Sequence, residues 1–283
     1  MNKKHGMLIY RKEDIARNKV FIDLLMKASY DVDRPLMLIT YEEMALQVAE
    51  SNLFLESEES LFPSFIINRS VSHWINEIAE SKEIRSFNSA KIARIANDKR
   101  LTHSTLSKID IPMLTTIHTS KETLVEHPPL DFPFVVKNPF GRGGTDVHLI
   151  DSADALKEVS SSLHDELIVQ PVGSAPGKDV RVFVIGNQII GAVLRESFDS
   201  ELRANISLGG SSKIYELNED EKSLINKIID HLKPDFVGLD FLLDENGKLT
   251  FNEMEDAVGC RSLYMNSEID IAALFMKYVA EQT

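Results

Sequence analysis

An Asp-Glu-Asn-Gly turn centred on Asn246-Gly247, between two runs of alternating apolar residues, most constrains the fold of this chain. Asn-Gly supplies the positive φ angles that a two-residue type I′ loop requires, so the sequence predicts a β-hairpin here. In that register Asp240 lies opposite Glu253, and strand alternation places Glu255 on the same face as Glu253. Three carboxylates therefore converge on one patch of sheet.

The carboxylate patch has two interpretations. Like charges that face each other destabilise a sheet, and Mg²⁺ carrying nucleotide phosphates prefers hard oxygen ligands with one or two protein carboxylates. The alternative is a solvated acidic hairpin. Against it, the opposite face is apolar, as expected for a sheet buried on that side, and it carries Val237, Leu239, Phe241, Leu243 and Met254. From the hairpin alone, both interpretations stay open.

Length, composition and charge narrow the class of protein. A chain of 283 residues, 43% hydrophobic and 27% charged, suits two or three modest domains of a globular protein. The formal charge of −13 disfavours a nucleic-acid or anionic-membrane partner. The sequence contains neither a membrane-spanning apolar run nor the apolar core of a secretory signal, so we expect a cytoplasmic protein. The lone Cys260 excludes an internal disulfide.

The first 90 residues alternate short strands and helices, which is typical of an α/β layer. We expect strands at His5–Tyr10, Leu36–Thr40 and Phe65–Asn68, and helices over about 13–29, 41–49 and 71–81. Arg69 follows the third strand, where ligands sit in such sheets. A solvated surface arginine is the favoured interpretation of Arg69, and a substrate contact is the alternative.

Basic residues and glycines then recur at positions where an anion could bind. Asp98 is a plausible N-cap, and Lys99 falls in the first helical turn, where a bound anion would suit it. Lys137 ends a strand that runs into a glycine-rich loop containing Arg142, whose backbone amides could approach a polyphosphate. Taken singly, an ordinary surface lysine and a plain turn explain these features as well. His103 reads as a surface histidine.

Six short phrases occur in one order along the chain: Asn97-Asp98-Lys99, VVKNPFGRGG at 135–144, Gly177-Lys178-Asp179-Val180-Arg181, Arg203-Ala204-Asn205 with Gly209-Gly210, Val237-Gly238-Leu239-Asp240, and Glu253-Met254-Glu255. In the order and the local sequence of these motifs the chain resembles the ATP-grasp enzymes. It is most similar to RimK-type ligases, which include a ribosomal-protein glutamate ligase and the carrier-protein ligases of lysine and arginine biosynthesis. The resemblance covers residues 86–260 well and the first 85 only in architecture.

The resemblance implies a mixed α/β and α+β fold. Two α+β subdomains would sandwich ATP behind a Rossmann-like N-terminal α/β domain. The expected boundaries are an N-terminal domain over 1–88, a central subdomain over 89–172, and a C-terminal subdomain with the metal site over 173–283.

The resemblance also implies a set of site residues. Lys99 and Lys137 would hold the α- and β-phosphates of ATP. The glycine-rich loop would fold over the β- and γ-phosphates, and it consists of Gly141, Arg142, Gly143 and Gly144. The adenine would meet backbone groups of Gln170, Pro171 and Val172, and the ribose would meet Asp179. Arg203 and Asn205 would reach the γ-phosphate. Arg195 and Arg203 would act in catalysis. The two Mg²⁺ ions would be held by Asp240, Glu253 and Glu255.

Two positions depart from the family pattern. Glu255 stands where the metal strand of the family has Asn, so the site carries one more negative charge and could favour Mn²⁺ or a different chemistry. Pro171 stands where a relative has Glu, so an adenine contact there must run through the backbone and neighbouring residues.

The activity implied is ADP-forming ligation, in which a carboxylate becomes an acyl phosphate and an amine then displaces phosphate to give an amide. The expected substrates are a small-molecule, peptide or carrier-protein carboxylate and an amine such as an amino acid, and the expected assembly is a homo-oligomer. The alternatives are an ATP-grasp phosphotransferase acting on a small molecule and a non-catalytic ATP-binding protein.

Overall fold

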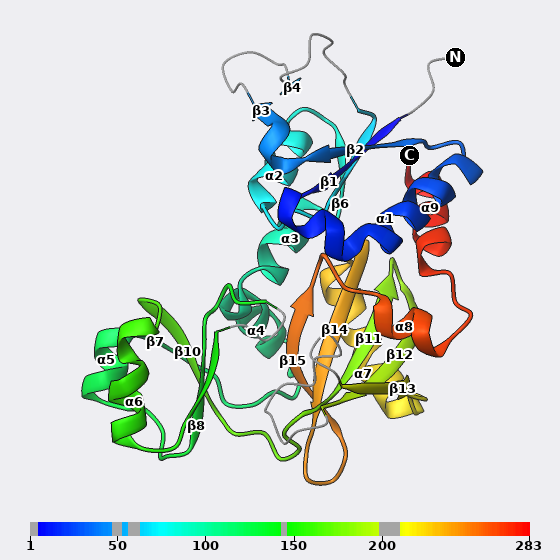
Figure 1. Ribbon diagram of the computed structural model, residues 1–283. Coiled ribbons are helices and arrows are strands. Elements are labelled where there is room, and N and C mark those ends of the chain that lie inside the picture. Colours follow the sequence, from blue (N-terminus) through cyan, green and yellow to red (C-terminus); the bar gives the residue numbers. More distant parts are fainter. Residues whose placement is uncertain (1–4, 47–52, 56–62, 143–145, 198–209) are drawn as a thin grey trace.

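The computed structural model describes residues 5–46, 53–55, 63–142, 146–197 and 210–283. Figure 1 shows three sheets, each covered by helices. The strand orders are β2-β1-β5-β6, β7-β10-β8-β9 and β13-β12-β11-β14-β15, with a separate β3-β4 pair. This is the mixed α/β and α+β architecture that the sequence predicts.

The N-terminal sheet is parallel. Its strands are β1 (Gly6–Tyr10), β2 (Leu36–Thr40), β5 (Phe65–Asn68) and β6 (Arg85–Phe87), accompanied by α1 (Lys12–Asp31) and α2 (His73–Ser81). Every residue of β1 is buried, because helices cover both faces of such sheets. The sequence prediction missed β6, which is only three residues long.

The helix expected over 41–49 is wrong. The chain makes a single turn of 3₁₀ helix, η1 (Tyr41–Glu43), closed by reciprocal capping between Thr40 and Glu43. It then becomes extended in β3 (Met44–Leu46), which pairs with β4 (Leu53–Leu55). Local capping therefore stabilises one helical turn. After it, the pairing of β3 with β4 stabilises an extended chain at residues where the sequence predicts a helix.

The central sheet is antiparallel and small. Its strands are β7 (Ile117–Ser120), β8 (Phe134–Lys137), β9 (Val147–Ile150) and β10 (Glu166–Pro171), with α5 (Lys121–Glu126), α6 (Ala153–Val159) and η2 (Ser160–Ser162). Figure 1 shows α5 and α6 on one side of this sheet, where they cover a core that contains Phe134, Ile150 and Leu156.

The C-terminal sheet is the largest. Its strands are β11 (Lys178–Ile185), β12 (Gln188–Glu196), β13 (Ser211–Ile214), β14 (Phe236–Leu243) and β15 (Leu249–Glu255). One face packs on α3 (Ala90–Ala96), α4 (Lys99–Ser107) and α7 (Glu219–Leu232). That apolar core includes Val237, Leu239, Phe241 and Met254, so the apolar side of the hairpin is buried as predicted.

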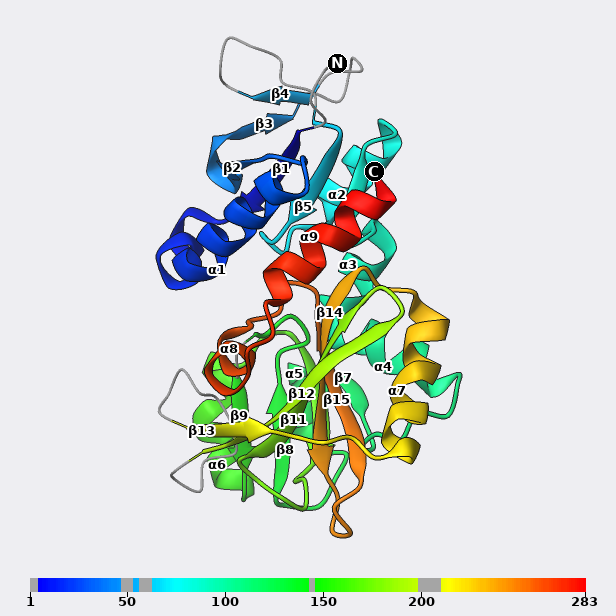
Figure 2. The same ribbon diagram turned by 90° about the vertical axis from the view of Figure 1, so that its right-hand side faces the viewer.

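The C-terminal helices return to the N-terminal layer. α8 (Arg261–Asn266) lies beside β12 and β13, and α9 (Ile271–Gln282) packs against α1. Figure 2 shows α9 running between the N-terminal sheet and the C-terminal sheet. One continuous core therefore joins Phe65 and Phe87 to Phe236 and Phe275.

The carboxylate hairpin forms, but its turn is not the predicted one. Leu243 pairs with Leu249, Gly247 N donates to Asp244 O at 3.0 Å, and only Gly247 has a positive φ, of 74°. This is a three-residue loop with glycine in the left-handed position. The one-residue shift is undone by a bulge at Asn252, so that Asp240 still pairs with Glu253.

Each sheet lies within one of the three segments that the sequence analysis delimits, although α3 and α4 pack on the C-terminal sheet. The domain boundaries stay a prediction. Among the described residues, no helix combines the length and the apolar character needed to traverse a bilayer.

Candidate active site

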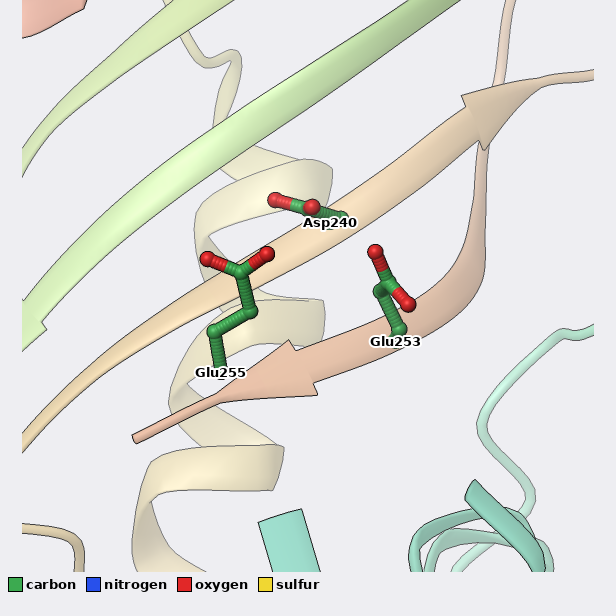
Figure 3. Close-up of side chains that lie close together, drawn as sticks. All are labelled: Asp240, Glu253 and Glu255. Carbon is green, nitrogen blue, oxygen red and sulfur yellow. The ribbon is translucent and has the colours of Figure 1, made fainter. Parts of the chain in front are cut away.

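Three carboxylates converge on the face of the C-terminal sheet opposite its apolar core. Asp240 on β14 and Glu253 and Glu255 on β15 each place a carboxylate oxygen within 4.8 Å of the others. Figure 3 shows the three side chains turned toward one another from the two strands. The strand pairing explains the cluster, because Asp240 opposes Glu253 and Glu255 lies two residues farther along β15.

Two guanidinium groups surround the most buried carboxylate. Arg181 donates to both oxygens of Asp240, at 2.7 and 2.6 Å, and Arg195 donates to Asp240 Oδ2 at 2.9 Å. Burial alone would raise the pKa of Asp240, but Arg181 and Arg195 outweigh it and lower that pKa to about 2. Arg181 also pairs with Glu255 at 2.8 Å. Asp240 is therefore ionised throughout the physiological range.

Sequence reasoning gave Arg181 no role, although it sits inside one of the motif phrases. The signal that could have found it is strand register. β11 pairs with β14, and Arg181 lies directly opposite Asp240. Alternation along β11 places Asp179 on the same face, and Asp179 binds Arg195 through two contacts of 2.6 Å.

The two lysines predicted to hold phosphates meet at the carboxylate strand. Lys99 lies 3.1 Å from Glu253 and donates to Gly141 O, while Lys137 donates to Asn252 Oδ1 at 3.0 Å. Burial lowers the pKa of Lys137 to about 8, with Glu253 opposing that effect and the charge of Lys99 adding to it. The structure therefore brings Lys99 and Lys137 to the same place, as the resemblance implies.

The start of the glycine-rich loop is tied to the end of the metal strand. Arg142 lies 3.2 Å from Asp256 and donates to Asn97 Oδ1 at 2.5 Å. Sequence reasoning missed Asp256, which is buried, and its place directly after Glu255 was the available signal. Gly143 and Gly144 lie outside the described residues, as do Arg203 and Asn205.

Of the four residues predicted to meet adenine and ribose, Gln170, Pro171 and Asp179 line one cavity and Val172 does not. Gln170 is buried and donates through Nε2 to Thr116 Oγ1 at 2.8 Å, while no group of the described residues donates to its Oε1. Pro171 is the last residue of β10 and pairs with Phe134, and Val172 follows the strand end. Burial raises the pKa of Asp179, and Arg195 opposes that rise.

A cavity of about 840 Å³ connects these groups. Its wall includes the two lysines, the carboxylates of Glu253 and Glu255, and residues of β10, β11, α1 and α8. Such a volume is within the range of small-molecule and cofactor sites. The cavity therefore offers both basic and acidic groups to a charged ligand, and part of its wall comes from α1 of the N-terminal layer.

Two interpretations from sequence are wrong. His103 is 4% exposed, its Nε2 lies 2.8 Å from Asn252 O, and burial lowers its pKa to about 4, so it is not a surface histidine. Arg69 is likewise 4% exposed and donates to Val258 O at 2.7 Å. Both side chains are covered by segments far away in sequence, which a local pattern does not reveal. Cys260 is buried, as expected for a small packed side chain.

The donor set fits a hard divalent cation. Three carboxylates offer oxygen ligands, and carboxylates with phosphate oxygens and water are the ligands that Mg²⁺ takes. Asp240 is the member with least freedom, because both its oxygens already bind guanidinium groups. Glu253 and Glu255 are the more accessible members, and both line the cavity.

Residues 96–279 match the model of the RimK-like ATP-grasp domain. The glutamate–LysW ligase ArgX of Sulfurisphaera tokodaii is 27% identical over 215 residues, which span 72% of this chain and 76% of that protein. The beta-citrylglutamate synthase B of Mus musculus is 26% identical over 262 residues, spanning 86% of this chain and 67% of that protein.

Solved structures agree on the fold. The crystal structure of a RimK domain ATP-grasp protein from Sphaerobacter thermophilus superposes with a TM-score of 0.75 at 19% identity. The match covers 97% of this chain and 99% of that one, so the likeness extends to the N-terminal layer that the family model leaves out.

Proposed function

The chain belongs to the RimK-like ATP-grasp family, and from that premise we propose an ATP-dependent, ADP-forming carboxylate–amine ligase. The observation that carries the proposal is the meeting of Lys99, Lys137, Glu253 and Glu255 in one cavity, with the buried Asp240 within 4.8 Å of both glutamates. Two of its relatives carry names that denote the joining of glutamate to another molecule, a LysW protein in one case and citrate in the other.

The reaction we propose has two steps. A substrate carboxylate attacks the γ-phosphorus of ATP and releases ADP, which leaves an acyl phosphate. An amine then attacks the acyl carbon and expels inorganic phosphate, giving an amide. Neither step requires a covalent bond to the protein, so positioning and electrostatic stabilisation supply the catalysis.

We assign the roles in the cavity as follows. Lys99 and Lys137 neutralise the α- and β-phosphates, and Gly141 with Arg142 opens the loop that covers the terminal phosphates. Gln170, Pro171 and Val172 border the adenine. Asp179 binds the ribose once the contact between Asp179 and Arg195 is released. Arg195 then faces the transferring phosphoryl group, together with Arg203 and Asn205 from the segment outside the described residues.

Asp240, Glu253 and Glu255 would hold the divalent metal, which, when bound, neutralises phosphate oxygens during transfer. We propose two Mg²⁺ ions, with Mn²⁺ as a substitute that the extra charge of Glu255 favours. Arg181 balances that charge, since it contacts both Asp240 and Glu255.

The test is ADP release from ATP and Mg²⁺ with pools of amino acids, peptides and small carboxylic acids, followed by mass analysis of the product. Hydroxylamine replaces the amine in a second arm, and a ligase yields a hydroxamate together with ADP. A phosphotransferase would release ADP with an alcohol and form no hydroxamate. ATP binding without ADP release across the whole panel would leave a non-catalytic binding protein.

The substrates we propose are a small-molecule, peptide or carrier-protein carboxylate and an amino acid. The volume of about 840 Å³, with α1 and α8 contributing to the wall, supports each of these three kinds of carboxylate. The expected homo-oligomer stays a prediction.

A further inference from the structure

We infer that Arg69 anchors a second anion subsite in the same cavity, which holds a substrate carboxylate that the ligation leaves unchanged. The inference rests on the proposed function, because it names the class of substrate that this site takes. That class is a molecule with a free carboxylate besides the groups that react.

The first observation is a buried positive charge that lacks an acidic partner. Arg69 is 4% exposed, its Nη2 donates to Val258 O at 2.7 Å, and its Nε has no hydrogen-bond partner in the described part of the chain. Within the described ranges no carboxylate forms an ion pair with it. Burying a guanidinium in this way is costly unless an anion compensates it.

The other buried arginines of the cavity differ from Arg69 in this respect. Arg181 pairs with Asp240, and Arg195 pairs with Asp179 and Asp240. The acid nearest in sequence to the Val258 contact is Asp256, and its hydrogen bonds go to Asn97 and Arg142. Among the buried arginines of the cavity that the structure describes, Arg69 is therefore the one without a carboxylate in hydrogen-bonding contact, and Asp256 acts on it only through space.

The second observation is that the Arg69 guanidinium lies against aromatic side chains. Its guanidinium carbon lies 4.9 Å from the ring centre of Phe21 and 5.6 Å from that of Tyr10, and all three residues line the cavity. The buried Tyr10 hydroxyl interacts with Arg69 and has no hydrogen bond of standard geometry within the described residues. An aromatic wall that holds a planar guanidinium leaves its donor edge for a carboxylate.

The third observation is that Arg69 and the carboxylate cluster have different partners. Arg69 donates to Val258 O, while Arg181 Nη1 donates to Gly259 O at 3.4 Å and Arg181 pairs with Asp240 and Glu255. We therefore assign to Arg69 a carboxylate other than the one that becomes phosphorylated.

Two substrates could bring such a carboxylate. One is the amine, if it is an amino acid with a free α-carboxylate; the other is the acid, if it carries two carboxylates. Both sources present the same chemistry to Arg69, so the experiment separates them with one probe for each.

Binding is measured first, by isothermal titration of the full-length protein with Mg²⁺ and a nonhydrolysable ATP analogue. The probes are L-glutamate and its α-amide for the amine source, and glutarate and its monoamide for the acid source. Wild-type protein is expected to prefer one free acid over its amide by about 100-fold, the size of effect expected when a hydrogen bond to a charged group is lost.

Arg69→Met is expected to abolish that preference by weakening acid binding about 100-fold, while amide binding and the ATP analogue change less than about twofold. Arg69→Lys retains the charge and is expected to show an intermediate preference. The matched control is Arg17→Met, which removes an exposed cavity arginine paired with Asp14. If Arg69→Met fails to fold, acid binding and amide binding are compared in Arg69→Lys and Tyr10→Phe instead.

An equal loss for acids, amides and the nucleotide analogue in Arg69→Met would show that Arg69 only supports the fold, and would overturn the inference. So would wild-type protein that binds neither acid more tightly than its amide. These outcomes do not depend on turnover. Failure of ADP release in the substrate panel would instead reject the ligase assignment.

Discussion

Lys137 is the residue whose protonation we expect to control nucleotide binding. Its pKa of about 8 lies below the ordinary lysine value because of burial, so the apo protein loses this charge as the pH rises through 8. Binding of ATP favours the charged form, and we expect affinity to fall up to about tenfold per pH unit above that point. The measurement is titration of a nonhydrolysable ATP analogue between pH 7 and 9.5.

The control for that titration is Lys137→Met, which should bind the analogue weakly at every pH and without the added pH dependence. Equal pH dependence in both proteins would mean that the phosphate groups alone titrate and that Lys137 keeps its proton.

His103 should make the fold sensitive to acid. Its folded pKa of about 4 lies below the ordinary value of 6.5, so the unfolded chain takes up a proton first as the pH falls. Stability that is fully present above pH 6.5 is therefore lost toward pH 4, by about 3 kcal/mol. Urea unfolding at pH 7, 5.5 and 4.5 measures this loss. His103→Gln should flatten the dependence, whereas His127→Gln, at an exposed position, should leave it as in wild type.

Glu255 should set the metal affinity. Glu255→Asn restores the family residue and removes one charge from the carboxylate cluster, so we expect activity to persist with an apparent Mg²⁺ affinity about tenfold weaker. Metal titration of ADP release measures the change, and Glu245→Asn in the hairpin loop is the control. Unchanged affinity in Glu255→Asn would show that Glu255 serves Arg181 rather than the metal.

At the scale of single elements, the hairpin shows what sequence can and cannot predict. Alternation identified both strands and the face that carries the carboxylates, because period 2 is a property of the backbone. The loop length and the bulge at Asn252 were missed, and the two errors cancelled at Asp240. A bulge depends on what the partner strand and the neighbouring helix α4 require, and these lie far away in sequence.

Two glycines of this hairpin should respond differently to alanine. Gly247→Ala places a Cβ in open space, so only its positive φ of 74° costs stability, about 1 kcal/mol. Gly238→Ala would bring a Cβ to 2.5 Å from Val258 Cγ2, and we expect a loss of up to about 3 kcal/mol. Urea unfolding of both variants compares the two, and a larger loss at Gly247 would contradict this account.

For the whole molecule, the sequence predicted three α/β or α+β units but not how they share a core. Nothing in the sequence of α9 identifies α1 of the N-terminal layer as the helix on which it packs. The same long-range packing covers Arg69 and His103, which explains why both were expected on the surface. Lys99, Lys137 and the carboxylates were predictable because each lies in a short recognisable phrase.

Phe275 should therefore stabilise the N-terminal and C-terminal sheets together. Its ring lies 4.8 Å from that of Phe236 and 6.4 Å from that of Phe87. Phe275→Ala should cost about 3–5 kcal/mol, and hydrogen exchange should speed up in both β1 and β14. The control is Leu274→Ala, at a residue 41% exposed. Faster exchange in one sheet alone would show that the layers unfold independently.

The bulge at Asn252 has a mechanical consequence. Freed from the ladder, this one residue offers its carbonyl to His103 on α4 and its carboxamide to Lys137 on the central sheet. It thereby links strand β15, helix α4 and the central sheet. If the carboxylates hold metal ions and Lys137 holds the nucleotide, we expect any shift of β15 on metal binding to move Lys137, so that each ligand changes the affinity for the other.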